Sequence, residues 1–276
     1  MINVGIYGVT GYAGYELLRW LGRHRDVRVI FTASESQSGK QLSEIFPGPL
    51  EARLIAPDDA PLGDVDVVFL GLPHGAAAKT AVRALDAGVR VIDLSADFRL
   101  ATPAAYTQWY GHEHPAPDLL PAAYGLVELN REQIRSARLV ANPGCYPTTV
   151  VLGLAPLLQA GLVSDPTIIV DSKSGISGAG RPPKQNTSFV EVNESLSAYN
   201  IGRVHRHVGE MEQEAAKLTT GTAPQIIFTP HLLPISRGML SSIYIRVPET
   251  LSEAAAVSYT HLRAHETKAN LVCRLL

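Results

Sequence analysis

A turn with three glycines separates the first apolar segment of the chain from the first helical segment. Ile2, Val4 and Ile6 alternate with other residues, which is the two-residue period of a β-strand. The turn reads Gly-Val-Thr-Gly-Tyr-Ala-Gly over 8–14, and apolar residues then recur at helical spacing up to Gly22. A strand that passes through such a turn into a helix begins a parallel α/β unit. This feature restricts the possible folds more than any other in the sequence.

The alternation of strands and helices continues through about the first half of the chain. Apolar runs at 27–31, 65–70 and 89–94 predict strands, and 76–87 predicts a helix between the last two. Such an order requires right-handed crossovers and gives a parallel sheet that helices cover on both faces. We therefore predict a doubly wound, Rossmann-type α/β domain over residues 1–146.

The second part of the chain has a different pattern. The sequence Asn-Pro-Gly-Cys-Tyr-Pro over 142–147 predicts a turn and then an apolar helix, with Pro147 suited to the first helical position. Further strands are predicted at 167–170, 225–229 and 241–247, and a helix by the apolar stripe Val208, Met211, Ala215 and Leu218. We predict a second, α+β domain over residues 147–257.

Composition and charge argue against several classes of function. The 24 basic and 26 acidic residues leave a net charge of −2, without the basic excess of nucleic-acid-binding proteins. The longest apolar stretch, 150–163, is shorter than the ~20 residues that span a bilayer. Cys145 and Cys273 are too few for a disulfide framework, and the chain opens with a strand pattern instead of a signal peptide. We predict a cytoplasmic protein that binds neither nucleic acid nor membranes.

The glycine turn is suited to bind the pyrophosphate of a dinucleotide. Glycine allows the backbone to approach the pyrophosphate closely, and the N-terminus of the following helix stabilises its charge. The spacing of Gly8, Gly11 and Gly14 differs by one residue from Gly-x-Gly-x-x-Gly, so close packing of helix on strand is an alternative explanation. We predict cofactor contacts from these three glycines and from Thr10.

The identity of the dinucleotide depends on the loop after the second predicted strand. Glu35 lies about 20 residues after Gly14, where NAD sites place an acid that binds the ribose hydroxyls. Ser34, Ser36 and Lys40 surround it and offer donors that a 2′-phosphate could use. We predict that Ser34 and Ser36 contact the cofactor, but these residue types leave NAD, NADP and an unliganded polar loop all open.

Cys145 is the candidate nucleophile. It lies between a predicted strand and a predicted helix, and a helix N-terminus stabilises a thiolate and so lowers the thiol pKa. This position is also at the carboxyl end of a strand, where open parallel sheets bind ligands. The alternative is an inert buried thiol, which is common for single cysteines.

Two histidines form the candidate acid-base group. His205 and His207 flank Arg206, and Glu210 follows His207 by three residues. If a helix begins near His207, Glu210 shares its face and can orient the imidazole. Surface histidines or a zinc site are the alternatives, although the chain has no Cys-x-x-Cys or His-Glu-x-x-His spacing to support a metal. We predict no metal.

A segment rich in glycine and hydrogen-bond donors, 172–181, follows the predicted strand at 167–170. Its backbone amides and the cations Lys173 and Arg181 can receive a phosphate or a carboxylate. We predict that Gly178 in this loop contacts the cofactor. A flexible connection without a ligand is the alternative.

Taken together, the chain resembles the N-acetyl-gamma-glutamyl-phosphate reductase family from Met1 to about Val257. Several long motifs in one order are more specific than any single motif. The motifs that carry the resemblance are Gly-Val-Thr-Gly-Tyr-Ala-Gly (8–14), Leu-Pro-His-Gly (72–75), Asp-Leu-Ser-Ala-Asp-Phe-Arg (93–99), Asn-Pro-Gly-Cys-Tyr-Pro-Thr (142–148), Ser-Gly-Ile-Ser-Gly-Ala-Gly-Arg (174–181) and His-Arg-His (205–207).

The resemblance implies an NADP-linked reductase of arginine biosynthesis that acts on a small acyl-phosphate substrate and forms a homodimer or homotetramer. It also implies that the second domain serves substrate binding and dimerisation. It implies that Cys145 forms a thioester, which is reduced and released as an aldehyde. His207, supported by Glu210, would move a proton at the substrate oxygen, with His205 as the alternative. The cations expected to bind the substrate carboxylate or phosphate are Arg99, Lys173 and Arg181.

The resemblance ends near Val257, whereas members of the family continue with further strands and a helix. We therefore expect residues 258–276 to be extraneous and the second domain to be incomplete. The rival hypotheses are a related acyl-phosphate reductase of the aspartate-semialdehyde or aminoadipyl type, and a dinucleotide-binding module without catalytic activity.

Overall fold

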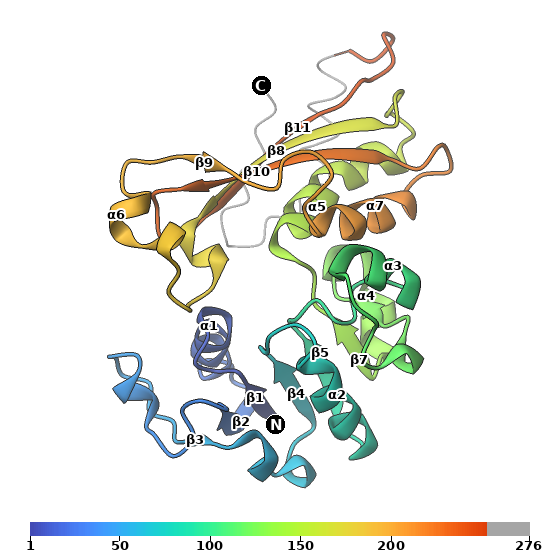
Figure 1. The fold of residues 1–276 in the computed structure, drawn as a ribbon. Coiled ribbons are helices and arrows are strands. Elements are labelled where there is room, and N and C mark those ends of the chain that lie inside the picture. Colours follow the sequence, from blue (N-terminus) through green and yellow to red (C-terminus); the bar gives the residue numbers. More distant parts are fainter. Residues whose placement is uncertain (253–276) are drawn as a thin grey trace. The chain divides into compact units, whose positions relative to one another are not determined.

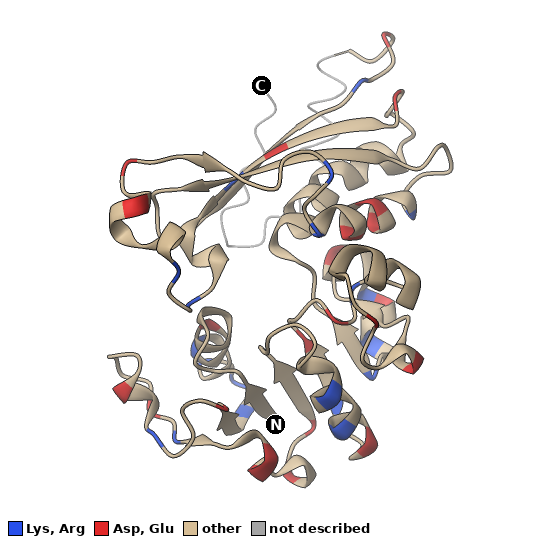
Figure 2. Cartoon of the chain, in the orientation of Figure 1, with Lys and Arg blue, Asp and Glu red and all other residues tan. Residues whose placement is uncertain are grey.

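The computed structural model describes residues 1–252 (Figure 1). The expectation for residues 258–276 and the last part of the predicted second domain, 253–257, lie outside the described residues. The chain divides into two compact units. The first contains Met1–Gly144 and Ala179–Pro183, and the second contains Cys145–Gly178 and the residues from Lys184 onward. In both units basic and acidic residues are interspersed along the chain, in keeping with the small net charge (Figure 2).

The first unit contains a seven-stranded sheet in which every pair of neighbouring strands is parallel. Its order is β3-β2-β1-β4-β5-β7-β6, so the strand order reverses between β1 and β4. The strands are β1 (Ile2–Tyr7), β2 (Val27–Ala33), β3 (Leu54–Ile55), β4 (Val67–Leu70), β5 (Arg90–Asp93), β6 (Ala123–Tyr124) and β7 (Leu139–Ala141). The predicted doubly wound sheet is confirmed, and its reversal point is where such sheets bind ligands.

Helices and apolar side chains fill the space on both faces of this sheet. Val4 and Ile6 of β1 belong to a core that includes Leu18, whereas Tyr7 belongs to a core that includes Ala81. This division follows from the two-residue period of a strand. The helices are α1 (Tyr12–Leu21), α2 (Ala77–Asp86), α3 (Pro103–Tyr110) and α4 (Val127–Ser136), and short 3₁₀ helices occur at Leu42–Glu44, Pro57–Asp59, Leu62–Asp64 and Pro117–Leu119.

The second unit contains a four-stranded mixed sheet in the order β11-β8-β10-β9. The central pair, β8 and β10, is parallel, and both edge strands are antiparallel to their neighbours. The strands are β8 (Thr167–Gly175), β9 (Ser197–Ala198), β10 (Gln225–Leu233) and β11 (Met239–Tyr244), and the helices are α5 (Cys145–Gln159), α6 (Phe189–Val192) and α7 (His207–Ala216), with 3₁₀ helices at Ile176–Ala179 and Gln185–Thr187. The α+β prediction is confirmed.

Two local predictions were wrong. The predicted loop at 172–181 begins later, because β8 continues to Gly175. The polar residues that suggested a loop are paired within the sheet, where Asp171 forms ion pairs with Lys173 and His231. The apolar helix begins at Cys145, two residues before the predicted start at Pro147, which the first turn of a helix also tolerates.

The described residues contain no helix that is both long and apolar enough to cross a membrane.

Candidate functional site

The glycine turn lies between the end of β1 and the start of α1. Gly8 has φ +73°, and a Cβ on it would lie 2.1 Å from the Gly71 carbonyl oxygen at the end of β4. A Cβ on Gly14 would lie 2.4 Å from the Gly8 carbonyl oxygen. Packing therefore requires glycine at both positions, as the close-packing alternative supposed.

Gly11 is different, because packing does not require it to be glycine. A Cβ there would meet only the Gly8 carbonyl oxygen, at an ordinary contact distance of 3.5 Å. Gly11 is the N-cap of α1, and it provides no side-chain cap for the first amides of that helix. The space beside Gly11 and the amides of α1 together fit a pyrophosphate, which supports the dinucleotide prediction.

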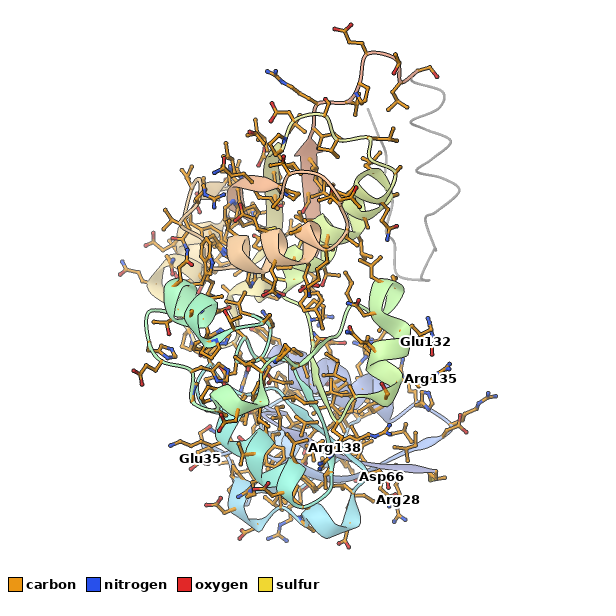
Figure 3. All side chains as sticks on the ribbon, turned by 90° about the vertical axis from the view of Figure 1, so that its right-hand side faces the viewer. Arg28, Glu35, Asp66, Glu132, Arg135 and Arg138 are labelled. Carbon is orange, nitrogen blue, oxygen red and sulfur yellow. The ribbon has the colours of Figure 1, made fainter. Side chains whose placement is uncertain are left out.

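The predicted cofactor contacts after β2 lie close to the turn. The hydroxyls of Thr10 and Ser34 are 3.1 Å apart, and Ser34 is buried. Glu35 and Ser36 follow directly and are exposed; Glu35 is labelled in Figure 3. Thus the two predicted hydroxyls of Thr10 and Ser34 bond to each other, whereas Glu35 and Ser36 face solvent. Their contacts with a cofactor stay predictions.

Arg181 lies against the same turn. Its Nη1 donates to the Thr10 carbonyl oxygen at 3.1 Å, and its guanidinium lies 4.5 Å from the centre of the Phe46 ring. Both contacts are within the first unit. The role predicted for Arg181 in substrate binding stays a prediction, and its position next to Thr10 was not foreseen.

Arg99 forms hydrogen bonds with the backbone just before the candidate nucleophile. Its Nε donates to the Asn142 carbonyl oxygen and its Nη2 to the Leu94 carbonyl oxygen, both at 2.9 Å. The residue is only 8% exposed. Arg99 therefore fixes the backbone at Asn142, three residues before Cys145. Its predicted contact with the substrate stays a prediction.

Two buried carboxylates lie in the same Asp-Leu-Ser-Ala-Asp-Phe-Arg motif. Asp97 accepts the amides of Gly75 and Ala78 and so caps the start of α2. Asp93 accepts the Ser95 amide at 3.0 Å, and burial raises its pKa to about 6. Sequence reasoning found the motif but not these functions: Asp97 binds backbone amides distant in sequence, and Asp93 binds an amide of its own turn.

Cys145 is the first residue of α5 and is exposed to solvent. It follows β7 after only three residues, because Asn-Pro-Gly forms the turn between strand and helix. The next residue, Tyr146, is 3% exposed. The thiol at the start of the helix is thus accessible, while its neighbour anchors the helix in the core.

The ring of Tyr146 brings both predicted histidines close to this helix start. Its centre lies 5.8 Å from that of His205, 6.0 Å from that of His207 and 5.1 Å from that of Phe228. The two imidazole centres are 4.8 Å apart. The fold therefore gathers residues more than fifty positions apart in sequence around the side chain next to Cys145.

Tyr199 completes this cluster through its hydroxyl, which is 3.1 Å from the Tyr146 hydroxyl. Burial raises the pKa of both phenols, and the charge of Cys145 raises them further. Sequence reasoning missed Tyr146, Tyr199 and Phe228. Only Tyr146 carried a signal, since it directly follows Cys145 in the Asn-Pro-Gly-Cys-Tyr-Pro motif.

The two histidines have different environments. His205 Nδ1 accepts the backbone amide of His207 at 3.1 Å, so the neutral ring carries its proton on Nε2. Burial, and to a smaller extent the charge of Arg206, lowers the pKa of His205 to about 4. His205 is therefore uncharged at neutral pH. His207 is the first residue of α7, and Glu210, only 1% exposed, follows one helical turn later.

Lys173 and Gly178 lie in settings that the sequence did not reveal. Lys173 Nζ is 2.6 Å from Asp171 Oδ2, and His231 Nδ1 is 3.1 Å from Asp171 Oδ1. A Cβ on Gly178 would lie 2.8 Å from Ser174 Oγ, so local packing accounts for this glycine. The predicted contacts of Lys173 with substrate and of Gly178 with cofactor stay predictions.

Among the described residues no group of three or more His, Cys, Asp or Glu side chains could hold a metal ion.

Two family descriptions match the two parts of the chain. Residues 3–137 match "Semialdehyde dehydrogenase, NAD binding domain", and residues 145–272 match "Semialdehyde dehydrogenase, dimerisation domain". The second match extends into residues 258–276.

Curated relatives and solved structures share this architecture. An N-acetyl-gamma-glutamyl-phosphate reductase of Halorhodospira halophila is 46% identical over 99% of this chain and 79% of its own length. One from Dehalococcoides mccartyi is 49% identical over 91% of this chain and 73% of its own. Aspartate semialdehyde dehydrogenase II of Vibrio cholerae, complexed with ASA, aligns with a TM-score of 0.69 and 20% identity over 94% of this chain and 78% of its own. That of Candida albicans, with NADP, aligns with a TM-score of 0.66 and 14% identity over 97% and 76%. At these low identities the two structures show a common fold alone.

Proposed function

The chain belongs to the N-acetyl-gamma-glutamyl-phosphate reductase family, and on that premise we propose that it reduces N-acetyl-L-glutamyl 5-phosphate to N-acetyl-L-glutamate 5-semialdehyde with NADPH. The reaction releases inorganic phosphate and is a step of arginine biosynthesis. The observation that carries the proposal is an exposed Cys145 at the first residue of α5, in a chain 46% identical to a reductase of this name over nearly its full length.

The glycine turn would hold the cofactor. The pyrophosphate fits beside Gly11 at the N-terminus of α1, and Thr10 and Ser34 lie next to it. The exposed hydroxyl of Ser36 is available to a 2′-phosphate. When bound, NADPH supplies the hydride that reduces the acyl group.

A pair of glycine variants tests this cofactor site. Gly11→Ala should weaken NADP binding at least about tenfold, because the methyl group occupies the space beside α1. It should lower the melting temperature by no more than about 3 °C, since it meets no close contact. Gly14→Ala is the contrasting variant, because its Cβ overlaps the Gly8 carbonyl and should cost about 1–3 kcal/mol of folding free energy. NADP titration and thermal unfolding measure both, and unchanged NADP affinity in Gly11→Ala would exclude this turn as the pyrophosphate site.

Cys145 performs the covalent step. Its thiolate attacks the acyl carbon, a carbon–sulfur bond forms, and the bond to the phosphate oxygen breaks. The N-terminus of α5 stabilises the thiolate, and its first amides can bind the oxyanion that develops during attack. After hydride addition the carbon–sulfur bond breaks again and the thiolate returns as the leaving group.

His207 is the better candidate for proton transfer at the substrate oxygen. His205 is uncharged at neutral pH, and its Nδ1 is already bonded to the His207 amide. His207 begins α7, and the buried Glu210 follows on the same face of the helix. Its carboxylate can orient the His207 imidazole or stabilise the protonated form of that ring. His207 would protonate the oxygen of the hemithioacetal, and it would accept that proton again when the aldehyde forms.

Substrate contacts, assembly and location complete the proposal. Arg99, Lys173 and Arg181 remain the candidate cations for the substrate, although all three have partners within the protein. A homodimer or homotetramer is supported by the match of residues 145–272 to a domain described as a dimerisation domain. A cytoplasmic location is consistent with a metabolic reductase that has only two cysteines.

Substrate profiling tests the activity. With N-acetyl-L-glutamate 5-semialdehyde, the protein should reduce NADP only when inorganic phosphate is present, as absorbance at 340 nm would record. Aspartate semialdehyde should give no reaction under the same conditions. Preference for aspartate semialdehyde would favour the related reductase, and NADP binding without turnover of either aldehyde would favour a non-catalytic module.

A further inference from the structure

The segment that carries the two histidines is fixed along the edge of β10. Ser197 and Ala198 pair with this strand as β9, and the Tyr199 amide then donates to the Pro230 carbonyl oxygen at 3.0 Å. Gly202 and Phe228 exchange two backbone hydrogen bonds of 2.8 Å. Beyond Gly202 the chain leaves the strand, so another contact must set the path to His205.

Arg203 and Glu212 make that contact. The guanidinium grips the carboxylate with both of its terminal nitrogens, with Nη2 3.0 Å from Oε2 and Nη1 on Oε1. Glu212 Oε1 also accepts the Ile226 amide at 2.7 Å, and Arg203 Nη1 donates to the Ile226 carbonyl oxygen at 3.3 Å. The pair thereby joins the histidine segment, α7 and the start of β10.

Arg203 and Glu212 lie on either side of the candidate acid-base residues in the sequence. Their ion pair therefore joins the two ends of the segment 203–212, which contains His205, His207 and Glu210. We propose that Arg203 and Glu212 are positioning residues, which hold the imidazoles of His205 and His207 against the Tyr146 ring beside Cys145 for the reaction. This inference rests on the proposed function.

The geometry argues for positioning more than for stability. The side chains of Arg203 and Glu212 are 40% and 20% exposed, and exposed ion pairs contribute only about 0–1 kcal/mol to folding. A bidentate grip nevertheless fixes direction, and lysine cannot reproduce its two parallel bonds. A displacement of about 1 Å in a catalytic group can cost about 10²-fold in rate. Loss of the pair should therefore change turnover much more than stability.

Two conservative variants and a control at the C-terminal end of α7 test the proposal. Arg203→Lys retains the charge without the fork, and Glu212→Gln retains an oxygen for the Ile226 amide without the ion pair. Each should lower kcat by about 10–100-fold, with the KM for NADP and the melting temperature nearly unchanged. The double variant should lose no more than either single variant, because both remove the same contact. Lys217→Gln breaks the ion pair with Glu214 in α7 and should leave kcat at the parent value.

A second readout does not depend on turnover. The rate of Cys145 alkylation by iodoacetamide is measured against pH in each variant. The apparent thiol pKa should rise in Arg203→Lys and Glu212→Gln, because displaced imidazoles no longer offer N–H donors to the thiolate, in addition to the amides of α5. Parent kcat and parent alkylation profiles in both variants would overturn the proposal. So would a loss of kcat that only follows a loss of folded protein. If the parent lacks reductase activity, the proposed function fails, and the alkylation profiles alone decide whether the pair positions the histidines.

Discussion

Replacing Cys145 with serine should reduce reductase turnover by at least about 10⁴-fold while NADP affinity stays at the parent value. A serine hydroxyl is almost entirely protonated at neutral pH, so the helix N-terminus has no anion to stabilise and no thioester forms. Steady-state NADP reduction in the presence of phosphate measures the first effect. Equilibrium NADP titration measures the second. The affinity should be unchanged because the glycine turn, which would bind the pyrophosphate, belongs to the first compact unit and Cys145 to the second.

The control and the pH dependence make this result specific. The sequence holds one other cysteine, and Cys273→Ser should retain parent turnover. Alkylation of Cys145 by iodoacetamide should report an apparent pKa below the ~8.5 of an ordinary thiol, because the amides of α5 favour the thiolate. Turnover that persists in Cys145→Ser would refute the nucleophile assignment, and an ordinary thiol pKa would show that the helix start does not activate it.

Replacing His207 with asparagine should lower kcat by about 10²–10⁴-fold, with little change in NADP affinity. Asparagine cannot carry a proton between the solvent and the substrate oxygen. The pH–rate profile should also lose the limb that reports the catalytic imidazole. Steady-state kinetics between pH 5 and 9 give both quantities.

His205→Asn is the matched variant for this test. An asparagine oxygen can accept the His207 amide in place of His205 Nδ1, so the start of α7 is retained. With its pKa lowered to about 4, His205 is already uncharged above pH 5, and its loss should leave the limb of the profile in place. If His205→Asn removes the limb and His207→Asn does not, the two assignments must be exchanged.

The sequence predicted the strands, turns and helices that depend on residues close to one another along the chain. The alternation of Ile2, Val4 and Ile6, the glycine turn and the helix behind it all appear as predicted, since each depends on neighbours a few residues away. A helix after the Asn-Pro-Gly turn follows in the same way, although it begins at Cys145 and not at the predicted Pro147. The parallel sheet could be predicted because strands that alternate with helices have few other arrangements.

Contacts between distant segments could not be predicted in this way. His231 of β10 meets Asp171 of the paired strand β8, and Lys173 meets Asp171 from two residues along β8 itself, so only the sheet explains why such polar residues continue β8. Arg99 has backbone carbonyls as partners, which no sequence pattern marks. The cluster around Tyr146 likewise depends on how α5, α7 and β10 pack, so the sequence identified the histidines but not the rings that hold them.

The open position of Cys145 also has a practical side. A sulfur that is exposed at the first residue of a helix is also accessible to peroxide and to small electrophiles. Preparations of this protein therefore need a reductant from cell lysis onward, and assays without one would measure the surviving unoxidised fraction. Conversely, a reactive fragment that modifies this sulfur would offer a starting point for covalent inhibitors.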